Sequence, residues 1–306
     1  MKNFKKGKLS DAAIAEWLIA LRAHAYVPES GFAVTAALRA RACGGEDYYF
    51  AGVNVENIDH RLSTHAEEGC IAAMVASLGK QAEIAEVWVM GATCCGKCRQ
   101  QIAGFAGENV KIHYMSPGGG SASTTVGAFL PEAFTLREFS AEKKSAGSGK
   151  FSAADVENRL FRKGNLTEPD IALWLREIDS IDYFSKISQA VVLKLDNGAY
   201  AAGAKVEDAA FLSLNAVQSA LAGAVSNFGA CAVQEAWVYS KGRAGKEIPP
   251  GSFGALTMSA LQSLLQMAEH AAIPVNFFAG DGSVARMTLT EAAKTAPTSG
   301  KPFYKK

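Results

Sequence analysis

The sequence predicts an α/β protein made of two tandem copies of one α/β/α domain, each with a mixed sheet flanked by helices. Two observations lead to this prediction: helix-like and strand-like segments alternate along the chain, and the alternation occurs twice within 306 residues. In open α/β sheets, ligands lie beyond strand ends, where loops lead into helix N-termini. We therefore expect a functional site at such a junction.

The first copy begins with a helix followed by a hairpin. Ser10 precedes an amphipathic segment at about residues 10–25, with Ala, Ile, Trp and Leu on one face, which is typical of a capped helix. Two β-rich stretches, 32–40 and 48–55, come next along the chain. Their order and spacing predict a pair of neighbouring strands.

The rest of the first copy continues the alternation. A helix is expected to open at Thr64, which is a suitable N-cap residue. The apolar run 86–92 predicts a strand that leads into a helix from Gly96. We further expect a strand over VKIHYM, a Gly/Ser-rich loop at 116–127 and a short terminal helix at LPEAF (130–134).

An internal repeat supports the second copy. The pattern G-x-x-V-E-[ND] begins at Gly52 and again at Gly203, 151 positions later. SGFAVTAAL (30–38) likewise aligns with SKISQAVVL (185–193), and each half begins with an amphipathic helix. Because three pairings occur in the same order, duplication explains them better than chance.

Composition and charge exclude several classes of protein. The formal net charge is +1 with interspersed charges, so we expect no nucleic-acid partner. No apolar run approaches the roughly 20 residues of a membrane span, and charges interrupt any signal-peptide core. We therefore expect a cytoplasmic protein with no membrane partner and a small-molecule substrate. Six cysteines in a chain of this length do not form a disulfide framework.

Three of the cysteines lie together at a predicted strand–helix junction. Cys95 and Cys98 form a C-x-x-C pair near a helix N-terminus, where unpaired N–H groups and the helix dipole stabilise thiolates. This spacing is typical of a thioredoxin-like redox motif and also of a zinc site. Taken alone, it leaves both interpretations open.

A second motif favours the zinc site. His65 and Glu67 form an H-x-E motif at a predicted helix start, and Cys95 follows Glu67 by 28 residues. One imidazole and two thiolates can bind zinc and leave a fourth position for water, which is the catalytic pattern. A carboxylate that is not needed as a ligand can then move protons, and Glu67 fits that role.

The residues of these motifs resemble those of one family. FAVTAA, AGVNVEN, THAE and CCGKCRQ occur in the order and spacing of the cytidine deaminase family, within the H-x-E…C-x-x-C signature of zinc-dependent base deaminases. The chain resembles the long, two-domain type, whose second domain has lost its metal. The resemblance covers nearly the whole chain and is strongest at 30–102. It implies Zn²⁺-dependent deamination of cytidine and deoxycytidine in pyrimidine salvage, by a homodimer.

The resemblance also implies a role for each site residue. Zinc would be bound by His65, Cys95 and Cys98, and Glu67 would transfer protons. The substrate would be contacted by Phe32 near the base, by Asn54 and Glu56 at the ribose hydroxyls, and by Val55 and the backbone of Ala66. Phe134 of LPEAF would reach a neighbouring subunit's pocket. Outside this context, Phe32 could equally belong to the core, and Asn54 with Glu56 to a turn.

Two residues depart from the family pattern. Cys94 stands where the family usually has proline, and it could compete with Cys95 as a zinc ligand. Glu68 stands where relatives with a histidine ligand carry a neutral residue, and it could either face solvent or alter the charge of the site. Two alternatives therefore stay open: a deaminase of a modified or antibiotic nucleoside, and a non-catalytic zinc- or redox-active nucleoside-binding protein.

The second half lacks the residues for this chemistry. It contains no C-x-x-C motif, and a shift of 151 positions places Ala216 opposite the histidine and Gln218 opposite the catalytic glutamate. The polar segment 139–156 is typical of an interdomain linker. We therefore predict a catalytic zinc-binding domain at 1–148 and a degenerate, non-catalytic domain at 149–306.

Overall fold

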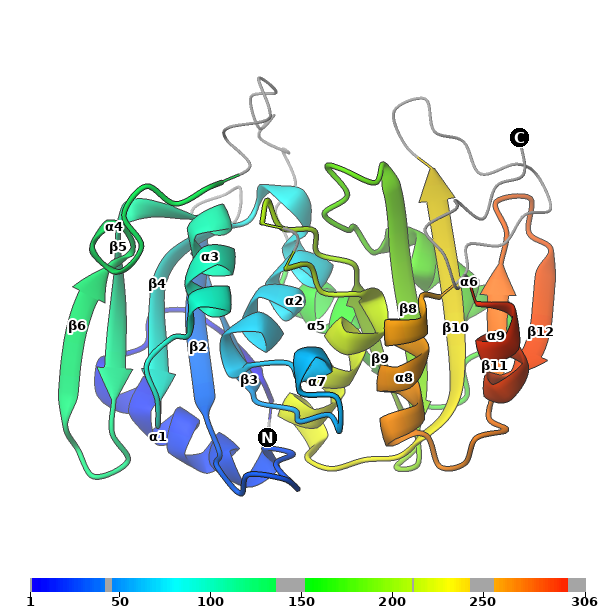
Figure 1. Cartoon of the computed structure of the whole chain (residues 1–306), viewed down its shortest axis with the longest axis horizontal. Helices are drawn as coiled ribbons and strands as arrows, with labels where there is room; N and C mark the ends of the chain where they lie inside the picture. The colour runs from blue at the N-terminus through cyan, green and yellow to red at the C-terminus, as the bar shows by residue number, and fades with distance from the viewer. Residues whose placement is uncertain (1, 42–45, 136–151, 211, 243–255, 297–306) are drawn as a thin grey trace.

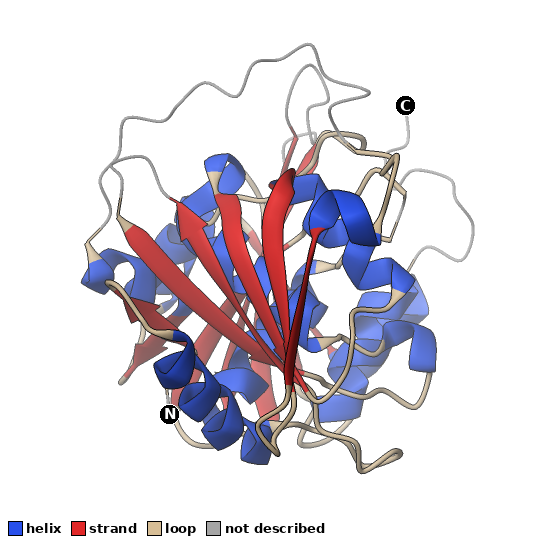
Figure 2. Ribbon diagram, turned by 90° about the vertical axis from the view of Figure 1, so that its left-hand side faces the viewer, coloured by secondary structure: helices blue, strands red, loops and turns tan. Residues whose placement is uncertain are grey.

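The structure is a computed structural model that describes residues 2–41, 46–135, 152–210, 212–242 and 256–296. These residues form two six-stranded mixed sheets that lie side by side, each flanked by helices (Figure 1). Viewed from one end, the strands of a sheet fan out with helices on both of its faces (Figure 2). The predicted fold class is confirmed.

The first sheet has the strand order β1-β3-β2-β4-β5-β6. β4 and β5 are parallel, and the other neighbouring strands are antiparallel. In chain order the elements are β1 (Phe4–Lys6), α1 (Asp11–Leu21), β2 (Thr35–Arg41), β3 (Asp47–Val53), α2 (Ala66–Leu78), β4 (Glu83–Met90), α3 (Gly96–Phe105), β5 (Ala106–Met115), β6 (Ser121–Thr125) and α4 (Val126–Phe129).

The second sheet repeats this order as β7-β9-β8-β10-β11-β12, again with one parallel pair, β10 and β11. Each strand therefore holds the same place as its counterpart in the first sheet. The elements are α5 (Ala153–Leu160), β7 (Phe161–Lys163), α6 (Glu168–Glu177), β8 (Ile187–Leu195), β9 (Ala199–Ala204), α7 (Ala216–Phe228), β10 (Val233–Gly242), α8 (Met258–Met267), β11 (Pro274–Phe278), β12 (Val284–Thr288) and α9 (Leu289–Thr295).

The repeated glycines let each central helix approach its sheet closely. A Cβ atom on Gly52 would lie 2.2 Å from the carbonyl oxygen of Ala66, and one on Gly203 would lie 2.2 Å from the amide nitrogen of Ala220. Because interiors are close-packed, a side chain at either position would push the helix away from the strand. The repeated glycines therefore allow α2 and α7 to pack directly against their strands.

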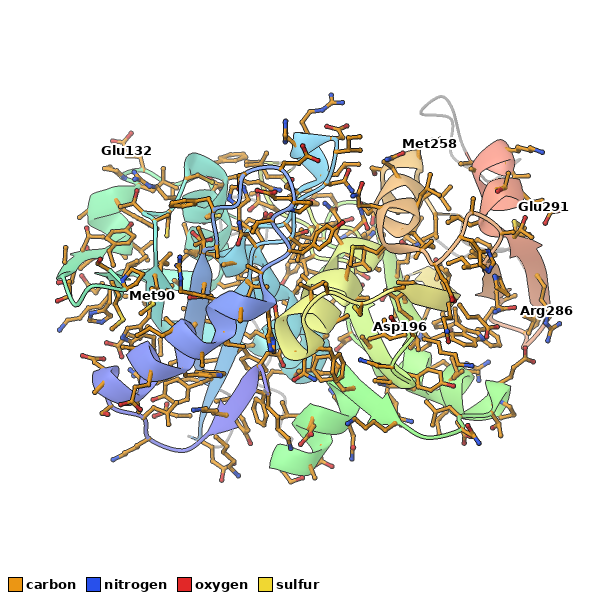
Figure 3. The ribbon with its side chains drawn as sticks, turned by 90° about the horizontal axis from the view of Figure 1, so that it is seen from below. Met90, Glu132, Asp196, Met258, Arg286 and Glu291 are labelled. Carbon is orange, nitrogen blue, oxygen red and sulfur yellow. The ribbon has the colours of Figure 1, made fainter. Side chains whose placement is uncertain are left out.

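The two copies share their core. The central helices α2 and α7 pack against each other between the sheets (Figure 1). Both large clusters of buried apolar side chains draw residues from both halves of the chain. Buried hydrogen bonds also cross the boundary, since the Val53 amide donates to Ser226 Oγ at 3.1 Å. Seen from below, Glu132 of the first copy and Arg286 on β12 lie at opposite ends of the molecule (Figure 3).

Two predicted elements at the end of the first copy were wrong. LPEAF is not helical: the short helix α4 precedes it, capped by the Thr125 side chain, which accepts from the Ala128 amide. The helix ends because Leu130 comes before Pro131, and the proline ring disfavours the α conformation of the residue that precedes it. The Gly/Ser-rich stretch 116–127 is also not merely a loop. It turns at Ser116, whose amide donates to the Gly120 carbonyl, and then forms β6 at the sheet edge.

Helix boundaries also shifted slightly from the prediction. The central helix of the first copy begins at Ala66 with His65 as N-cap, not Thr64, because Thr64 pairs with Val55 in an isolated β-bridge. Most of the predicted linker 139–156 lies outside the described residues, but its end is helical from Ala153. Within the described ranges, no helix combines the length and apolar character of a membrane span.

Candidate metal centre

His65 is held at the start of α2 by the loop that precedes it. Val55 and Thr64 exchange two backbone hydrogen bonds of 2.8 and 2.9 Å, so the chain enters the helix along a fixed path. His65 then takes an extended conformation as N-cap, while its carbonyl accepts from the Gly69 amide. The imidazole is half-buried and projects from the helix N-terminus.

The two cysteines come from the next strand–helix junction. The strand β4 ends at Met90, and the chain enters α3 with Cys95 as its N-cap residue. Cys98 follows one turn later and is buried, whereas Cys95 reaches the surface. The N-termini of α2 and α3 therefore meet at one point, as the spacing of the two motifs predicted.

The three side chains form a compact cluster suited to zinc. Nδ1 of His65 lies 3.4 Å from each of the two cysteine sulfurs, which are 3.6 Å apart. Tetrahedral zinc with ordinary bond lengths implies about 3.6 Å between nitrogen and sulfur and about 3.8 Å between sulfurs. The donor set and its spacing therefore fit a zinc ion with one position left for a further ligand.

The electrostatics of the cluster favour one thiolate even without a metal. Hydrogen bonds from Cys98 and from His65 lower the pKa of Cys95 to about 3. The same contact with Cys95, together with burial, raises the pKa of Cys98, so the pair shares one proton. The hydrogen bond with Cys95 outweighs burial and raises the pKa of His65. Metal binding releases these protons, since thiolates and neutral imidazole are the ligands.

Glu67 lies beside the cluster but outside it. It is the second residue of α2, its side chain is only 4% exposed, and burial raises the pKa of its carboxyl group. The Cys94 thiol contacts this carboxyl group, and burial raises the pKa of Cys94 as well. A buried carboxyl group whose pKa is raised by its surroundings holds a proton more readily than an exposed one, which suits a general acid–base group.

Cys94 is buried and does not join the cluster, although it is adjacent to Cys95 in sequence. Its carbonyl accepts a hydrogen bond of 2.9 Å from Nε of Arg99. The same guanidinium donates through Nη1 to the Phe129 carbonyl, so it joins the start of α3 to the end of α4. The turn before α3 is therefore held by the hydrogen bonds of Arg99, whereas a proline at position 94 would have restricted its backbone directly.

Glu68 is fully buried and does not face solvent. One carboxylate oxygen accepts from the His65 amide at 2.9 Å, and the other lies 2.8 Å from Nζ of Lys97. Lys97 stands inside the C-x-x-C motif, and the sequence analysis overlooked it. A lysine at a helix N-terminus, where the dipole is unfavourable to it, was the available signal.

The predicted substrate-binding residues gather on the loops next to the cluster. The Asn54 side chain donates to the Phe32 carbonyl and accepts from the Val34 amide, both at 2.9 Å. The Glu56 carboxylate accepts from the amides of Glu29 and Ser30, so both polar side chains organise the loop that carries Phe32. The Phe32 side chain is 55% exposed and thus not a core residue. Val55 and Ala66 are buried.

The second copy has no such cluster among its described residues. Helix α7 begins 150 positions after α2, so the shift of 151 was wrong by one at this point: the loop before α7 is one residue shorter. Asn215 therefore takes the place of His65, Val217 that of Glu67 and Gln218 that of Glu68. In α8, Thr257 and Ala260 take the places of Cys95 and Cys98. None of these side chains provides the imidazole or thiolate ligands of a zinc site.

The fold and site define an α/β protein with an open His-Cys-Cys metal centre. A family model described as the cytidine and deoxycytidylate deaminase zinc-binding region matches residues 10–114. A cytidine deaminase of Mycoplasma pneumoniae is 39% identical over 95 residues, which cover 29% of this chain and 67% of that protein. A cytidine deaminase of Sporosarcina psychrophila is 33% identical over 123 residues, which cover 39% of this chain and 87% of that protein.

The crystal structure of a cytidine deaminase from Burkholderia pseudomallei aligns with 41% of this chain and 100% of its own, at 29% identity and a TM-score of 0.36. The chain belongs to the cytidine deaminase family, as the two sequence relatives show. The predictions of an enzyme of this family and of zinc as its cofactor are confirmed.

Proposed function

We propose that the chain catalyses the hydrolytic deamination of cytidine and deoxycytidine to uridine and deoxyuridine, with release of ammonia. The single observation that carries this proposal is the buried Glu67 carboxyl group beside the His65–Cys95–Cys98 cluster. Membership of the cytidine deaminase family supports it. In this proposal His65, Cys95 and Cys98 are the zinc ligands, and Glu67 is the catalytic residue.

Glu67 accounts for the proton transfers that the reaction requires. Zinc, when bound, supplies a Lewis acid that lowers the pKa of a water molecule. Glu67 accepts a proton from the attacking water and delivers it to ring N3 as the oxygen adds to C4. It then transfers the second proton of that water to the amino group, which leaves C4 as ammonia. One carboxyl group thus acts first as base and then as acid, which suits a buried position with a raised pKa.

The loops beside the cluster fit a nucleoside. Phe32 offers an exposed aromatic ring to the base, and the loop that carries it is fixed by Asn54 and Glu56. We infer that these two polar side chains also meet the ribose hydroxyls. The remaining contacts are assigned to Val55, on the same loop, and to the backbone of Ala66 at the helix start.

The second copy acts as a structural partner in this proposal. The Gln218 side-chain amide donates to the Leu62 carbonyl at 2.9 Å, in the loop that leads to His65. In return, the Gln101 amide of α3 donates to the Leu212 carbonyl at 2.6 Å. Each copy thus supports the loop before the other's central helix. We retain 1–148 as the catalytic domain and 149–306 as the degenerate one.

The homodimer, the cytoplasmic location and the role in pyrimidine salvage stay predictions from the sequence. The role of Phe134 at a neighbouring subunit is also a prediction, although its side chain is 47% exposed and thus accessible. Deamination of a modified nucleoside remains the alternative within the same chemistry, because the polar loop contacts do not identify the base.

The proposed function is tested by ammonia release from a panel of substrates. Zinc-loaded protein is incubated with cytidine, deoxycytidine and free cytosine, with and without a zinc chelator. We expect release from both nucleosides, little from cytosine, which lacks the sugar, and loss of activity with the chelator. No release from either nucleoside by zinc-loaded protein would overturn the proposal and leave the modified-nucleoside and non-catalytic interpretations.

A further inference from the structure

An ion pair between a fully buried carboxylate and a partly exposed lysine joins the two helix N-termini that carry the candidate zinc ligands. Glu68 lies on the first turn of α2, is 0% exposed, and accepts from the backbone amide of His65. Its second oxygen lies 2.8 Å from Nζ of Lys97, which stands between Cys95 and Cys98 on α3. The pair therefore connects the backbone of one ligand residue to the segment that contains the other two.

Helix energetics alone do not account for Lys97. A cation in the first turn of a helix meets the positive end of the helix dipole and is disfavoured there. A buried carboxylate without a partner is strongly destabilising, whereas a paired one is tolerated. Lys97 thus stands where α3 itself disfavours a cation and where the Glu68 carboxylate requires one.

The second copy provides an internal comparison. Gln218 occupies the place of Glu68 and likewise accepts from the amide of its N-cap residue, Asn215, at 3.3 Å. Ser259 occupies the place of Lys97, as the second residue of α8. The capping function is therefore served by a neutral amide in the copy without the cluster. The charged pair occurs in the copy that has the cluster.

We propose that the Glu68–Lys97 pair is a positioning device for the zinc ligands. Glu68 holds the His65 backbone, and Lys97 holds Glu68 against α3, which keeps the three donor atoms at ligand spacing. Lys97 also cancels the charge of Glu68 beside the two thiolates and Glu67. This inference rests on the proposed zinc ligation. It states that the Glu68–Lys97 pair strengthens zinc binding and takes no part in proton transfer.

The test is a double-mutant cycle on zinc affinity. Wild type, Glu68→Gln, Lys97→Met and the double variant are titrated with zinc in competition with a chromogenic chelator. Lys97→Met leaves a buried carboxylate uncompensated, and we expect zinc to bind about tenfold more weakly or worse, as for other residues that support metal ligands. The double variant keeps an oxygen that can cap the His65 amide but lacks the link to α3, so we expect its zinc affinity to lie between those of Lys97→Met and wild type, about threefold or more below wild type. Lys97→Arg, which keeps the charge, should also remain close to wild type.

Melting of the metal-free proteins separates positioning from general stability. If the pair served only the fold, Lys97→Met would lower the melting temperature and leave zinc affinity unchanged, which would overturn the inference. Additive losses in the double variant would overturn it as well. If Lys97→Met does not fold, the double variant decides alone: weaker zinc binding than wild type supports the inference, and zinc binding equal to wild type overturns it. Lys111→Met, at an exposed lysine of β5, is the matched control. Wild type that binds no zinc would instead refute the proposed ligands.

Discussion

Cys94 and Cys95 are neighbours in sequence, yet their thiols have different surroundings. Cys95 is the N-cap residue of α3 and lies within hydrogen-bonding distance of His65. Cys94 is buried and contacts the Glu67 carboxyl group. Because successive residues at a helix start point in different directions, only one of the two reaches the cluster. The competition between them that the sequence left open therefore favours Cys95.

Zinc stoichiometry distinguishes the two thiols. We expect Cys94→Ala to retain one zinc per chain, because its sulfur lies outside the cluster. Cys95→Ala removes one of the three proposed ligands and is expected to lose zinc in the presence of a mild chelator. Metal content measured by atomic emission after gel filtration checks both variants. Loss of zinc from Cys94→Ala and its retention in Cys95→Ala would reverse the assignment.

The grouping of the three cluster residues was predictable because their types and spacing are specific to metal binding. His65, Cys95 and Cys98 are few, reactive, and placed at helix starts, so sequence alone brought them together. The burial of Glu68 and its pairing with Lys97 were not predictable in this way. They depend on how α2 and α3 approach each other, and no local pattern specifies that approach.

At the scale of elements, the loop before each hairpin is held by one carboxylate. Glu56 accepts from backbone amides of residues 29 and 30, and Glu207 accepts from the amides of Phe184 and Ser185. In the second copy, Lys205 replaces Asn54 and pairs with Glu207 at 3.0 Å. In the second copy, the two side chains at the positions that would meet a ribose are thus already paired with each other.

Glu207 makes the stability of the second copy depend on pH. Burial opposes its ionisation, but the hydrogen bond from Ser185 and the charge of Lys205 outweigh it and lower the pKa of Glu207. The stabilisation is therefore present above the unfolded pKa of about 4.3 and is lost as pH falls through the lower folded value. We expect Glu207→Gln to reduce the free energy of unfolding by about 2 kcal/mol at pH 7.

Urea unfolding of the metal-free proteins from pH 7 down to about pH 2 measures this effect, because the loss lies below the unfolded pKa. The difference between wild type and Glu207→Gln should shrink as the pH approaches the lower end, since protonation removes the same charge. Glu108→Gln, at an exposed glutamate, is the control and should change stability little at any pH. A difference that stays constant with pH would contradict the account.

Element prediction succeeded where helices and strands bury an apolar face and failed where they do not. The hairpin of β2 and β3, and the strand β4 before α3, carry apolar side chains whose pattern specifies them. The edge strand β6 consists of Ser, Ala and Thr, and rests on backbone pairing with β5. Its composition therefore resembles that of a loop, and its partner is visible only in the sheet.

At the scale of the whole molecule, the two copies are joined through their central helices. Gly69 of α2 faces Ala222 of α7 closely, since a Cβ on Gly69 would lie 3.5 Å from that of Ala222. The shared apolar clusters mean that separating the copies would expose buried surface from both. The duplication was predictable from the repeated motifs, whereas this shared core was not, because small residues on a helix can face either a sheet or another helix.

We therefore expect the two copies to unfold as one cooperative unit. Differential scanning calorimetry of the zinc-loaded chain should give one transition, with a calorimetric enthalpy equal to the van't Hoff enthalpy. Zinc removal should lower the melting temperature of that single transition, because metal bound only to the folded state stabilises all of it. Two separate transitions, with only one sensitive to zinc, would show that the copies fold independently.

The central claim is that Glu67 performs the proton transfers of a zinc-dependent deamination. The most direct measurement is ammonia release from cytidine by zinc-loaded wild type beside Glu67→Gln, with the zinc content of both proteins determined. We predict release by wild type and a loss of about 10²–10⁴-fold or more in the variant, with zinc still bound. A variant that retains zinc and releases ammonia at the wild-type rate would contradict the claim.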